Sequence, residues 1–213
     1  MPSTVERVHV ELGPRSYDIE IGTGNMAQLA DRLRAASNLS KAVVIADKNV
    51  IDPHASACIA SLEAAGIAHT LFKIASGEKS KSIEQISQLW NEMLACGTDR
   101  HSVVVAVGGG VIGDLAGFAA ASYARGLPFF QVPTTLLSDV DSSVGGKVGI
   151  NLPGAKNMVG AFWQPQGVLI DTAALTTLPD REYRAGLAEV VKYGVILDAE
   201  FFTYLEANID GLN

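Results

Sequence analysis

The sequence has no long hydrophobic run and no apolar signal segment. None of its apolar stretches reaches the roughly 18 residues that a membrane-spanning helix needs. The opening residues, MPSTVERVHVEL, contain no continuous apolar core of the kind found in secretory signal peptides. These two absences argue against a membrane protein and predict a cytoplasmic location.

Cysteine, histidine and positive charge are also scarce. Cys58 and Cys96 are the only cysteines, and each lies in a helical stretch, which predicts reduced core residues rather than a disulfide or metal pair. The four histidines are far apart in the sequence, and we expect surface or strand positions for them. The net charge of −7 argues against a nucleic-acid partner. An anionic ligand would therefore need local Lys and Arg residues to hold it.

What the sequence does have is a regular alternation of strand and helix patterns. Alternating apolar and polar residues on both sides of residues 13–15 predict an N-terminal β-hairpin. Strands and helices then alternate, which predicts an α/β fold with a Rossmann-like, mostly parallel sheet covered on both faces. We expect strands at 42–46, 67–74, 103–107, 128–132 and 168–171, and helices at 26–36 with Asn25 as its cap, at 53–65 and at 82–95.

The strand pattern stops near Leu178. Residues 177–182 read as a helix start, with a proline at the front and acidic residues in the first turn. Helices are expected to about residue 197 and over 200–209. We therefore expect an α/β domain over residues 1–177 and the beginning of an all-α domain over residues 178–213. Two helices make a poor independent domain, so the sequence reads as part of a longer protein.

Residues 102–121 organise the chain. An apolar strand is followed by a glycine turn, Gly108-Gly109-Gly110, and then by helical spacing, which is a phosphate-binding layout. Gly108, Gly110 and Gly113 satisfy the dinucleotide pattern, but no acidic residue follows until Asp139. The alternatives are a tight turn in any α/β domain and a nucleotide site of non-standard layout, which we favour.

Polar residues follow each predicted strand, at the edge where parallel sheets bind ligands. These strand ends are Asp47, residues 76–78, residues 108–114 and residues 133–135. Two further polar runs, which we expect to be loops, carry Asp141, Ser142 and Lys147 in one and Lys156 and Asn157 in the other. The first run could be a solvated loop, but a lysine with an amide can also hold a carboxylate or phosphate.

The last predicted helix carries three charged residues in a suggestive pattern. Glu182 and Glu189 share one face, and Lys192 follows one turn later. A surface ion pair between Glu189 and Lys192 is one interpretation. The other is an inward-facing Glu189, since its neighbours are apolar, and a buried carboxylate needs a lysine or a metal as its cation.

With these residues in view, nearly the whole chain resembles the 3-dehydroquinate synthase family. The matching blocks are GEKSKS (77–82), the glycine segment (108–126), PTTLLSDVDSSVGGKVGINLPGAKNMVGAFWQP (133–165) and TLPDREYRAGLAEVVKYG (177–194). The resemblance implies an NAD-binding α/β domain followed by a helical metal-binding domain, and a homodimer. It also implies conversion of the phosphorylated keto acid DAHP to 3-dehydroquinate and phosphate in the shikimate pathway, with catalytic NAD and Zn²⁺ or Co²⁺ as a Lewis acid.

The resemblance also implies roles for individual residues. Substrate contacts are implied for Arg125, Asp141, Lys147, Lys156, Asn157 and Lys192, of which Asp141, Lys147 and Lys192 are the expected catalytic residues. Arg125 is expected to reach the phosphate bound by a neighbouring subunit, and Glu189 matches the carboxylate ligand of the metal. Cofactor contacts are implied for Asp47, which would hold the adenine ribose, and for Asn49, Glu78, Lys81, Gly109, Gly110, Asp114, Thr134, Thr135, Leu137, Ser142, Thr177, Leu178 and Glu182.

One departure from the family pattern is large. The two histidine ligands of the metal have no match here, and Glu189 alone cannot make a three-ligand zinc site. We therefore expect this chain to bind NAD without turning over. Three alternatives remain: a related sugar-phosphate cyclase, an iron-type polyol dehydrogenase and a non-catalytic NAD-binding module. The dense lysines favour a phosphorylated, carboxylated substrate over a neutral polyol.

Overall fold

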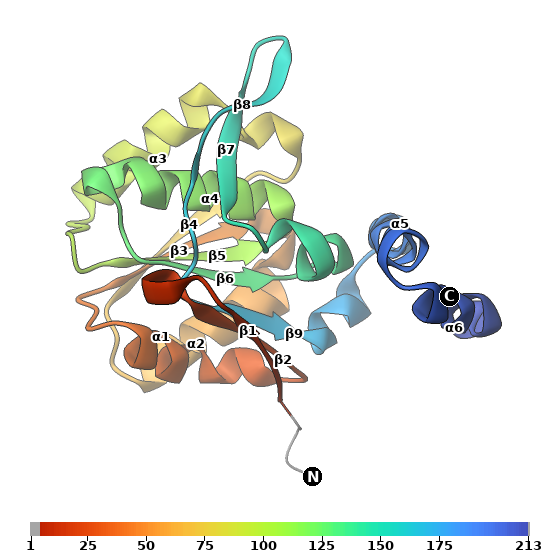
Figure 1. Cartoon of the computed structure of the whole chain (residues 1–213). Helices are drawn as coiled ribbons and strands as arrows, with labels where there is room; N and C mark the ends of the chain where they lie inside the picture. The colour runs from red at the N-terminus through yellow and green to blue at the C-terminus, as the bar shows by residue number, and fades with distance from the viewer. Residues whose placement is uncertain (1–4, 213) are drawn as a thin grey trace.

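The computed structural model describes residues 5–212 and arranges them around one seven-stranded sheet (Figure 1). Neighbouring strands pair in parallel except at the N-terminal hairpin, where β1 and β2 are antiparallel. This architecture confirms the predicted α/β class. In spatial order the strands are β1 (Glu6–Val10), β2 (Tyr17–Gly22), β9 (Val168–Asp171), β6 (Phe129–Pro133), β5 (Val103–Gly108), β3 (Ala42–Asp47) and β4 (His69–Ile74).

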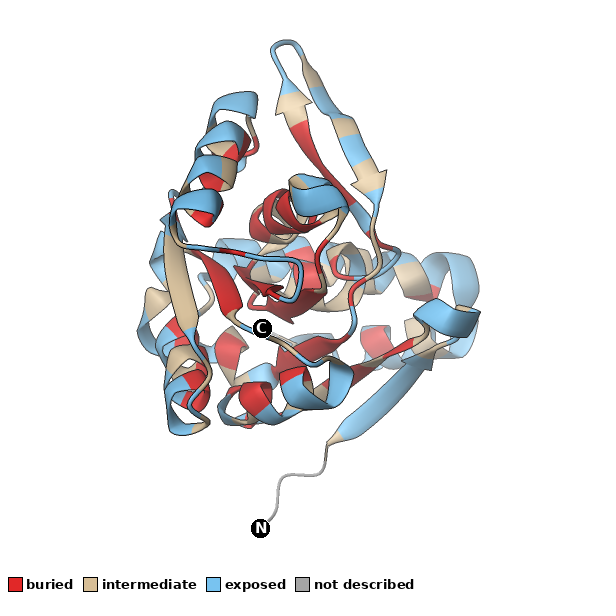
Figure 2. Ribbon diagram, turned by 90° about the vertical axis from the view of Figure 1, so that its left-hand side faces the viewer, coloured by how far each residue is buried: buried red, intermediate tan, exposed pale blue. Residues whose placement is uncertain are grey.

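Helices cover both faces of the sheet, which explains why its central strands are apolar throughout (Figures 1 and 2). Side chains of β3 alternate between two hydrophobic clusters: Val44 packs with α1 and α2, whereas Val43 and Ile45 pack with α3 and α4. The helices are α1 (Leu29–Ala36) and α2 (Ser56–Ala64) on one face, and α3 (Ile83–Ala95) and α4 (Gly110–Ser122) on the other.

The prediction that Asn25 caps the first helix is wrong. Residues Asn25–Gln28 form a 3₁₀ turn before α1, and the buried Asn25 amide donates to the Ile170 carbonyl at 3.0 Å. The neighbouring Asp171 carboxylate accepts from the backbone N–H groups of Gly24 and Met26. Contacts with β9 therefore determine the conformation of this segment, and the sequence pattern within residues 25–36 could not reveal those contacts.

Parts of the two polar runs expected as loops form a second, two-stranded sheet instead, whereas Asp141 and Ser142 of the first run lie in a helical turn over Ser138–Ser142. Strand β7 (Lys147–Leu152) pairs antiparallel with β8 (Ala155–Phe162). Val148 and Ile150 are buried in the cluster around α4, which accounts for the strand, because alternate residues of β7 face that helix. The approach is close: a Cβ on Gly117 of α4 would lie 2.3 Å from a Val148 methyl. Lys147, Lys156 and Asn157 therefore sit on a hairpin rather than on flexible loops.

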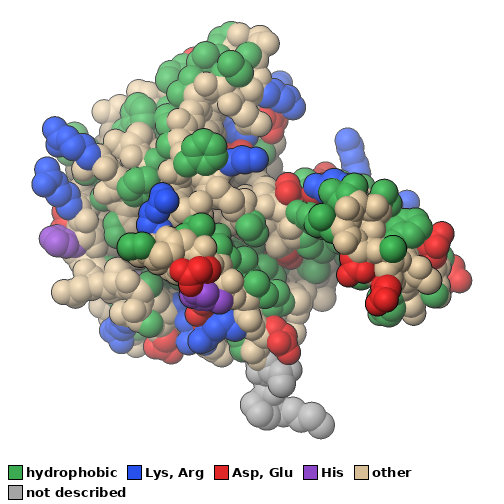
Figure 3. Space-filling model, viewed as in Figure 1, with side chains coloured by type: hydrophobic (Ala, Val, Ile, Leu, Met, Phe, Trp, Pro, Cys, Tyr) green, Lys and Arg blue, Asp and Glu red, His purple; other side chains and the backbone are tan. Residues whose placement is uncertain are grey.

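Beyond the sheet the chain is helical, as predicted. Helices α5 (Asp180–Leu197) and α6 (Ala199–Ala207) pack against each other beside the α/β layers (Figure 1). Hydrophobic side chains are visible on the surface of this helical region (Figure 3). Two hydrophobic residues of α5 are strongly exposed, Val195 at 63% and Leu197 at 75%. Within residues 5–212, no helix combines the length and the apolar character that crossing a membrane would require. A domain boundary at residue 177 stays a prediction.

Candidate functional site

The glycine turn lies where the strand order changes direction. Helix α2 follows β3 on one face of the sheet, and α4 follows the adjacent β5 on the other, so the carboxyl ends of these two strands form the switch point at which open α/β sheets bind ligands. Gly108 ends β5 and Gly109 is the N-cap of α4. The sequence therefore predicted the position of this turn correctly, at an edge that suits an anionic group near a helix N-terminus.

The next strand end packs tightly on this turn. A Cβ on Gly110 would lie 2.8 Å from Ser142 Oγ, and a Cβ on Gly109 would lie 3.1 Å from a Thr135 methyl. Only residues without side chains keep this surface open. Ser142 Oγ and Thr134 Oγ1 are buried with no hydrogen-bond partner. Buried hydroxyls are normally paired, so these two fit a ligand that lies along the turn, and the residues present fit a dinucleotide.

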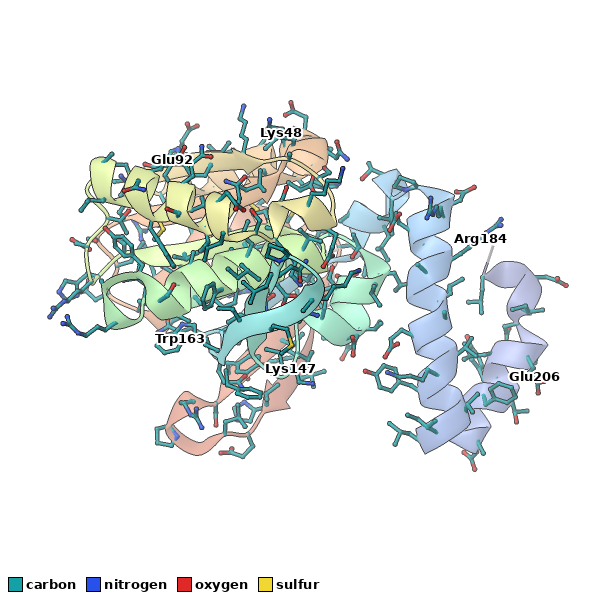
Figure 4. The ribbon with its side chains drawn as sticks, turned by 90° about the horizontal axis from the view of Figure 1, so that it is seen from above. Lys48, Glu92, Lys147, Trp163, Arg184 and Glu206 are labelled. Carbon is teal, nitrogen blue, oxygen red and sulfur yellow. The ribbon has the colours of Figure 1, made fainter. Side chains whose placement is uncertain are left out.

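Asp47 lies at the end of β3, beside the end of β5 that carries the glycine turn. Its Oδ1 accepts from the backbone N–H of Asn49 at 2.8 Å and also from Ser76 Oγ. Asp47, Asn49 and the segment after β4 thus meet at one edge, as the sequence predicted. In the view from above, Lys48, the neighbour of Asp47, and Lys147 of the hairpin lie well apart (Figure 4).

A buried lysine joins the glycine helix to the hairpin. The Lys81 side chain is only 4% exposed, and its Nζ lies 2.5 Å from Asp114 Oδ2 and 2.6 Å from Asn157 Oδ1. Glu78 Oε1 is 3.9 Å from the same nitrogen. Burial raises the pKa of the Asp114 carboxyl, and the Lys81 ammonium opposes that rise. Four predicted residues therefore form one network, which the sequence could not reveal because they come from three separate segments.

A cavity of about 550 Å³ opens beside this network. The hairpin, α4 and the segment after β6 all contribute to its walls. It is large enough for a small phosphorylated metabolite, and its polar residues combine two carboxylates with a lysine, a hydroxyl and an amide. Five of the predicted site residues line it: Asp114, Asp141, Ser142, Lys147 and Asn157.

Other predicted residues lie elsewhere. Arg125 is exposed at the far end of α4, with a left-handed backbone (φ +70°), and the exposed Lys156 does not line the cavity. Thr177 lies nearer than Arg125 to the carboxyl edge of the sheet, because its hydroxyl is 2.6 Å from Nε2 of His54, a residue in the segment after β3. Leu178 lies in the segment that leads into α5, and Glu182 lies in the first turn of that helix. The structure does not bring Arg125 to the cavity of its own chain.

Glu189 forms an ion pair with Lys192 on α5, as the simpler interpretation predicted. Its side chain is 18% exposed, so it is partly buried. Residues 5–212 contain no group of three or more His, Cys, Asp or Glu side chains that could hold a metal ion. The described residues therefore do not make a metal site, and we assign no step to a metal.

Helix α5 directly contacts the segment after β6, which contributes Asp141 and Ser142 to the cavity wall. A Cβ on Gly186 would lie 2.6 Å from Leu136 Cβ, so the helix packs closely on the segment after β6. Tyr193 OH lies 3.3 Å from the Val140 carbonyl and 3.4 Å from Asp141 Oδ1. The helical region thus touches the predicted catalytic residue Asp141.

Asp139, in the same loop, provides a test of the site's electrostatics. Burial raises the pKa of Asp139 to about 7, with a further contribution from the Asp171 carboxylate, and its Oδ1 is buried without a partner. Between the usual value of 3.8 and about 7, the folded state holds a proton that the unfolded state has lost. Raising the pH through this window therefore favours unfolding, and the loss levels off above it.

We expect Asp139→Asn to remove this pH dependence. The variant should be more stable than the wild type at pH 8 by at least about 1 kcal/mol, and the advantage should shrink toward pH 4. Urea unfolding between pH 4.5 and 8 measures both proteins. If the stabilities of the two proteins changed with pH in the same way, the raised pKa would not belong to Asp139.

With this geometry established, the chain can be compared with known proteins. Residues 71–185 match the family described as 3-dehydroquinate synthase N-terminal. The chain belongs to the 3-dehydroquinate synthase family. This confirms the resemblance seen in the sequence, and the family match covers β4 to α5, which includes the glycine turn, the hairpin and the cavity.

Curated members of the 3-dehydroquinate synthase family are similar over almost the whole chain. The enzyme of Rhodopirellula baltica is 58% identical over 212 residues, which are 97% of this chain and 56% of that protein. The enzyme of Rhizobium etli is 51% identical over 207 residues, again 97% of this chain and 55% of that protein. The chain thus spans about half the length of the curated relatives that it matches.

Solved structures give the same fold with ligands bound. A 2-epi-5-epi-valiolone synthase from Streptomyces hygroscopicus, solved with NAD⁺ and Zn²⁺, has a TM-score of 0.83 and 34% identity, covering 97% of this chain and 57% of that one. A 2-deoxy-scyllo-inosose synthase, solved with carbaglucose-6-phosphate, NAD⁺ and Co²⁺, has a TM-score of 0.81 and 29% identity, covering 90% of this chain and 52% of that one.

The sequence reasoning missed Asn151 and the hairpin that carries it. Asn151 Nδ2 donates to Glu78 Oε1 at 2.8 Å, and its Oδ1 accepts from the Asn157 backbone at 2.8 Å. A signal was present: Val148 and Ile150 alternate with polar or small residues, and a Pro-Gly turn follows. The glycines and charges around them suggested loops instead.

Proposed function

We propose that this chain forms the cofactor-binding part of a 3-dehydroquinate synthase. The observation that carries the proposal is the carboxyl edge of the sheet, where the glycine turn, two unpaired buried hydroxyls and the Lys81 network adjoin one polar cavity. NAD, when bound, would supply hydride transfer to and from the substrate. Because the curated relatives are longer than this chain, we propose the complete reaction for a protein of their length.

Each part of the edge has a distinct task in this proposal. The turn at Gly109 and Gly110 would let the backbone approach the pyrophosphate at the N-terminus of α4. Thr134 and Ser142 would donate their unpaired hydroxyls to the cofactor. Asp47 would accept from the adenine ribose, as an acidic residue does in other dinucleotide sites. That placement explains why no carboxylate follows the glycines at the usual distance.

The cavity residues would bind the substrate. Lys147 lies in the cavity wall and would hold a phosphate or carboxylate by charge-assisted hydrogen bonds, while Asn157 would orient it. Asp141, on the same wall, is the residue best placed to accept a substrate proton. Lys192 is held by Glu189 on α5, and we propose that it contacts the substrate only when that ion pair opens. The DAHP substrate, the homodimer and the cytoplasmic location are parts of the proposal. So is a metal at Glu189, whose other ligands would have to come from outside residues 5–212.

A second candidate is a cyclase with another product. It is favoured by the fold shared with the 2-deoxy-scyllo-inosose synthase and the 2-epi-5-epi-valiolone synthase, which are 29% and 34% identical to this chain. The cavity, with Lys147 in its wall, suits a phosphorylated sugar acid and a phosphorylated sugar equally, so its lining does not distinguish the two substrates. Incubating the whole protein with DAHP and, separately, with sedoheptulose 7-phosphate distinguishes the two, because only a 3-dehydroquinate synthase should release phosphate from DAHP preferentially.

The proposal predicts that the wild-type chain binds NAD and that Asp47→Asn weakens binding about tenfold, the typical effect of losing a charge-assisted hydrogen bond. Isothermal titration calorimetry with NAD measures both. The matched control is Asp31→Asn, the same charge change on the exposed surface of α1, which should bind as the wild type does. Failure of the wild type to bind NAD would refute the proposed cofactor site, and equal losses in both variants would refute the role of Asp47.

A further inference from the structure

Asn151 occupies an irregular position in the hairpin. The ladder pairs Ile150 with Val159 and then Leu152 with Ala155, so the register shifts at Asn151. Its backbone N–H donates to the Lys81 carbonyl at 2.8 Å, outside the ladder. Irregularities of this kind turn a side chain away from the regular strand pattern. The Asn151 side chain is therefore directed toward the turn that carries Glu78 and Lys81.

Both ends of the Asn151 side chain are used. Its Nδ2 donates to Glu78 Oε1 and its Oδ1 accepts from the Asn157 backbone N–H, each at 2.8 Å. Asn157 has a left-handed backbone (φ +54°), a conformation that costs a non-glycine residue free energy unless its surroundings hold it. Its own side chain then accepts from Lys81 Nζ at 2.6 Å. One amide thus fixes the start of β8 against the turn after β4.

We propose that Asn151 is a positioning residue for the cofactor and substrate site. It holds Asn157 in its strained conformation, and Asn157 in turn places the ammonium of Lys81 between itself and Asp114. This role rests on the proposed function, because Glu78 and Lys81 are the proposed cofactor residues and Asn157 the proposed substrate residue. Asn151 itself does not line the cavity, so it acts through its neighbours.

The two hydrogen bonds of Asn151 require a side chain that can both donate and accept. The side chain must donate toward the Glu78 carboxylate and accept from the Asn157 N–H. An aspartate at this position accepts but donates only when protonated, so N151D should fail at neutral pH and recover as its new carboxyl takes up a proton. The charged groups around that carboxyl are Glu78, Lys81 and, beyond Lys81, Asp114. Alanine can neither donate nor accept, so N151A should not recover.

The test compares wild type, N151A, N151D and the control N38D, which makes the same change on an exposed loop. Amide exchange by NMR reports the Asn157 N–H without any cofactor, and calorimetry reports NAD affinity between pH 5.5 and 8. We expect about tenfold faster Asn157 exchange and about tenfold weaker NAD binding in N151A at every pH, the loss that one hydrogen bond implies. In NAD affinity, N151D should match N151A at pH 8, where its carboxylate cannot donate to Glu78, and approach the wild type at pH 5.5. N38D should match the wild type in both measurements.

Two results would overturn the role of Asn151. One is Asn157 exchange in N151A within twofold of the wild type. The other is unchanged NAD affinity in N151A while the wild type binds. A wild type that binds no NAD at all refutes the proposed function, and with it the cofactor role of Asn151. Thermal unfolding of each variant shows whether a loss is confined to the site, since a general loss of stability would also speed exchange at amides in β3 and β5, far from the hairpin.

Discussion

Gly110→Ala should abolish most NAD binding while leaving the chain folded. The added methyl would lie 2.8 Å from Ser142 Oγ, on the surface that must stay open for the pyrophosphate of the cofactor to approach the protein backbone. Gly110 is the first residue of α4, where alanine is a better helix former, so the helix itself gains from the change. We expect at least about a thirtyfold loss in NAD affinity, since the clash displaces both the cofactor and Ser142. Calorimetric titration with NAD measures the loss.

The control for this experiment is Gly211→Ala. It adds the same methyl group near the end of the described chain, where nothing lies within 4 Å of the new Cβ. Its NAD affinity should equal that of the wild type. Thermal melts of both variants should show intact cooperative unfolding. If Gly110→Ala binds NAD as tightly as Gly211→Ala does, the cofactor does not lie along the glycine turn.

Much of the fold was accessible from the sequence because its strands are buried on both faces. The continuous apolar run at 103–107 and the four-residue run at 168–171 became β5 and β9 with almost the same bounds. Parallel strands covered by helices leave this simple signal. The glycine turn was found for a related reason, since the need for an open, tightly turned backbone leaves few residue choices.

The site was harder to predict because its contacts join distant segments. Nothing in the run GEKSKS indicates that Lys81 is buried, yet it lies buried beside Asp114, 33 residues later, and Asn157, 76 residues later. Asn25 likewise contacts Ile170, 145 residues away. Nothing local to either residue specifies such a partner, and only the crossing order of the strands brings them together. The resemblance to a family supplied Lys81 as a site residue, and the structure supplies its partners.

Lys81→Met should be the most destabilising of the substitutions considered. It removes the cation from a buried pair and leaves the Asp114 carboxylate, 24% exposed, without its partner at 2.5 Å. Breaking a pair of this kind costs about 3 kcal/mol, at the lower end of the usual range because Asp114 keeps some contact with water. Methionine retains most of the side-chain volume, so packing changes little. Urea unfolding at pH 8 measures the loss, and Lys192→Met, which removes the exposed partner of Glu189, should cost no more than about 1 kcal/mol.

The double variant Lys81→Met, Asp114→Asn separates charge from packing. With neither charge left in the pair, most of the lost stability should return, because a neutral pair needs no buried counter-ion. The single variant should also recover at low pH. Burial already raises the pKa of Asp114 and Lys81 opposes it, so removing Lys81 lets that pKa rise further. The folded state of the single variant then binds a proton that the unfolded state lacks, and its stability must increase as the pH falls from 8 toward 5. A deficit that is the same at both pH values, and that persists in the double variant, would mean that Lys81 supports the site by packing alone and that its charge does not hold Asp114.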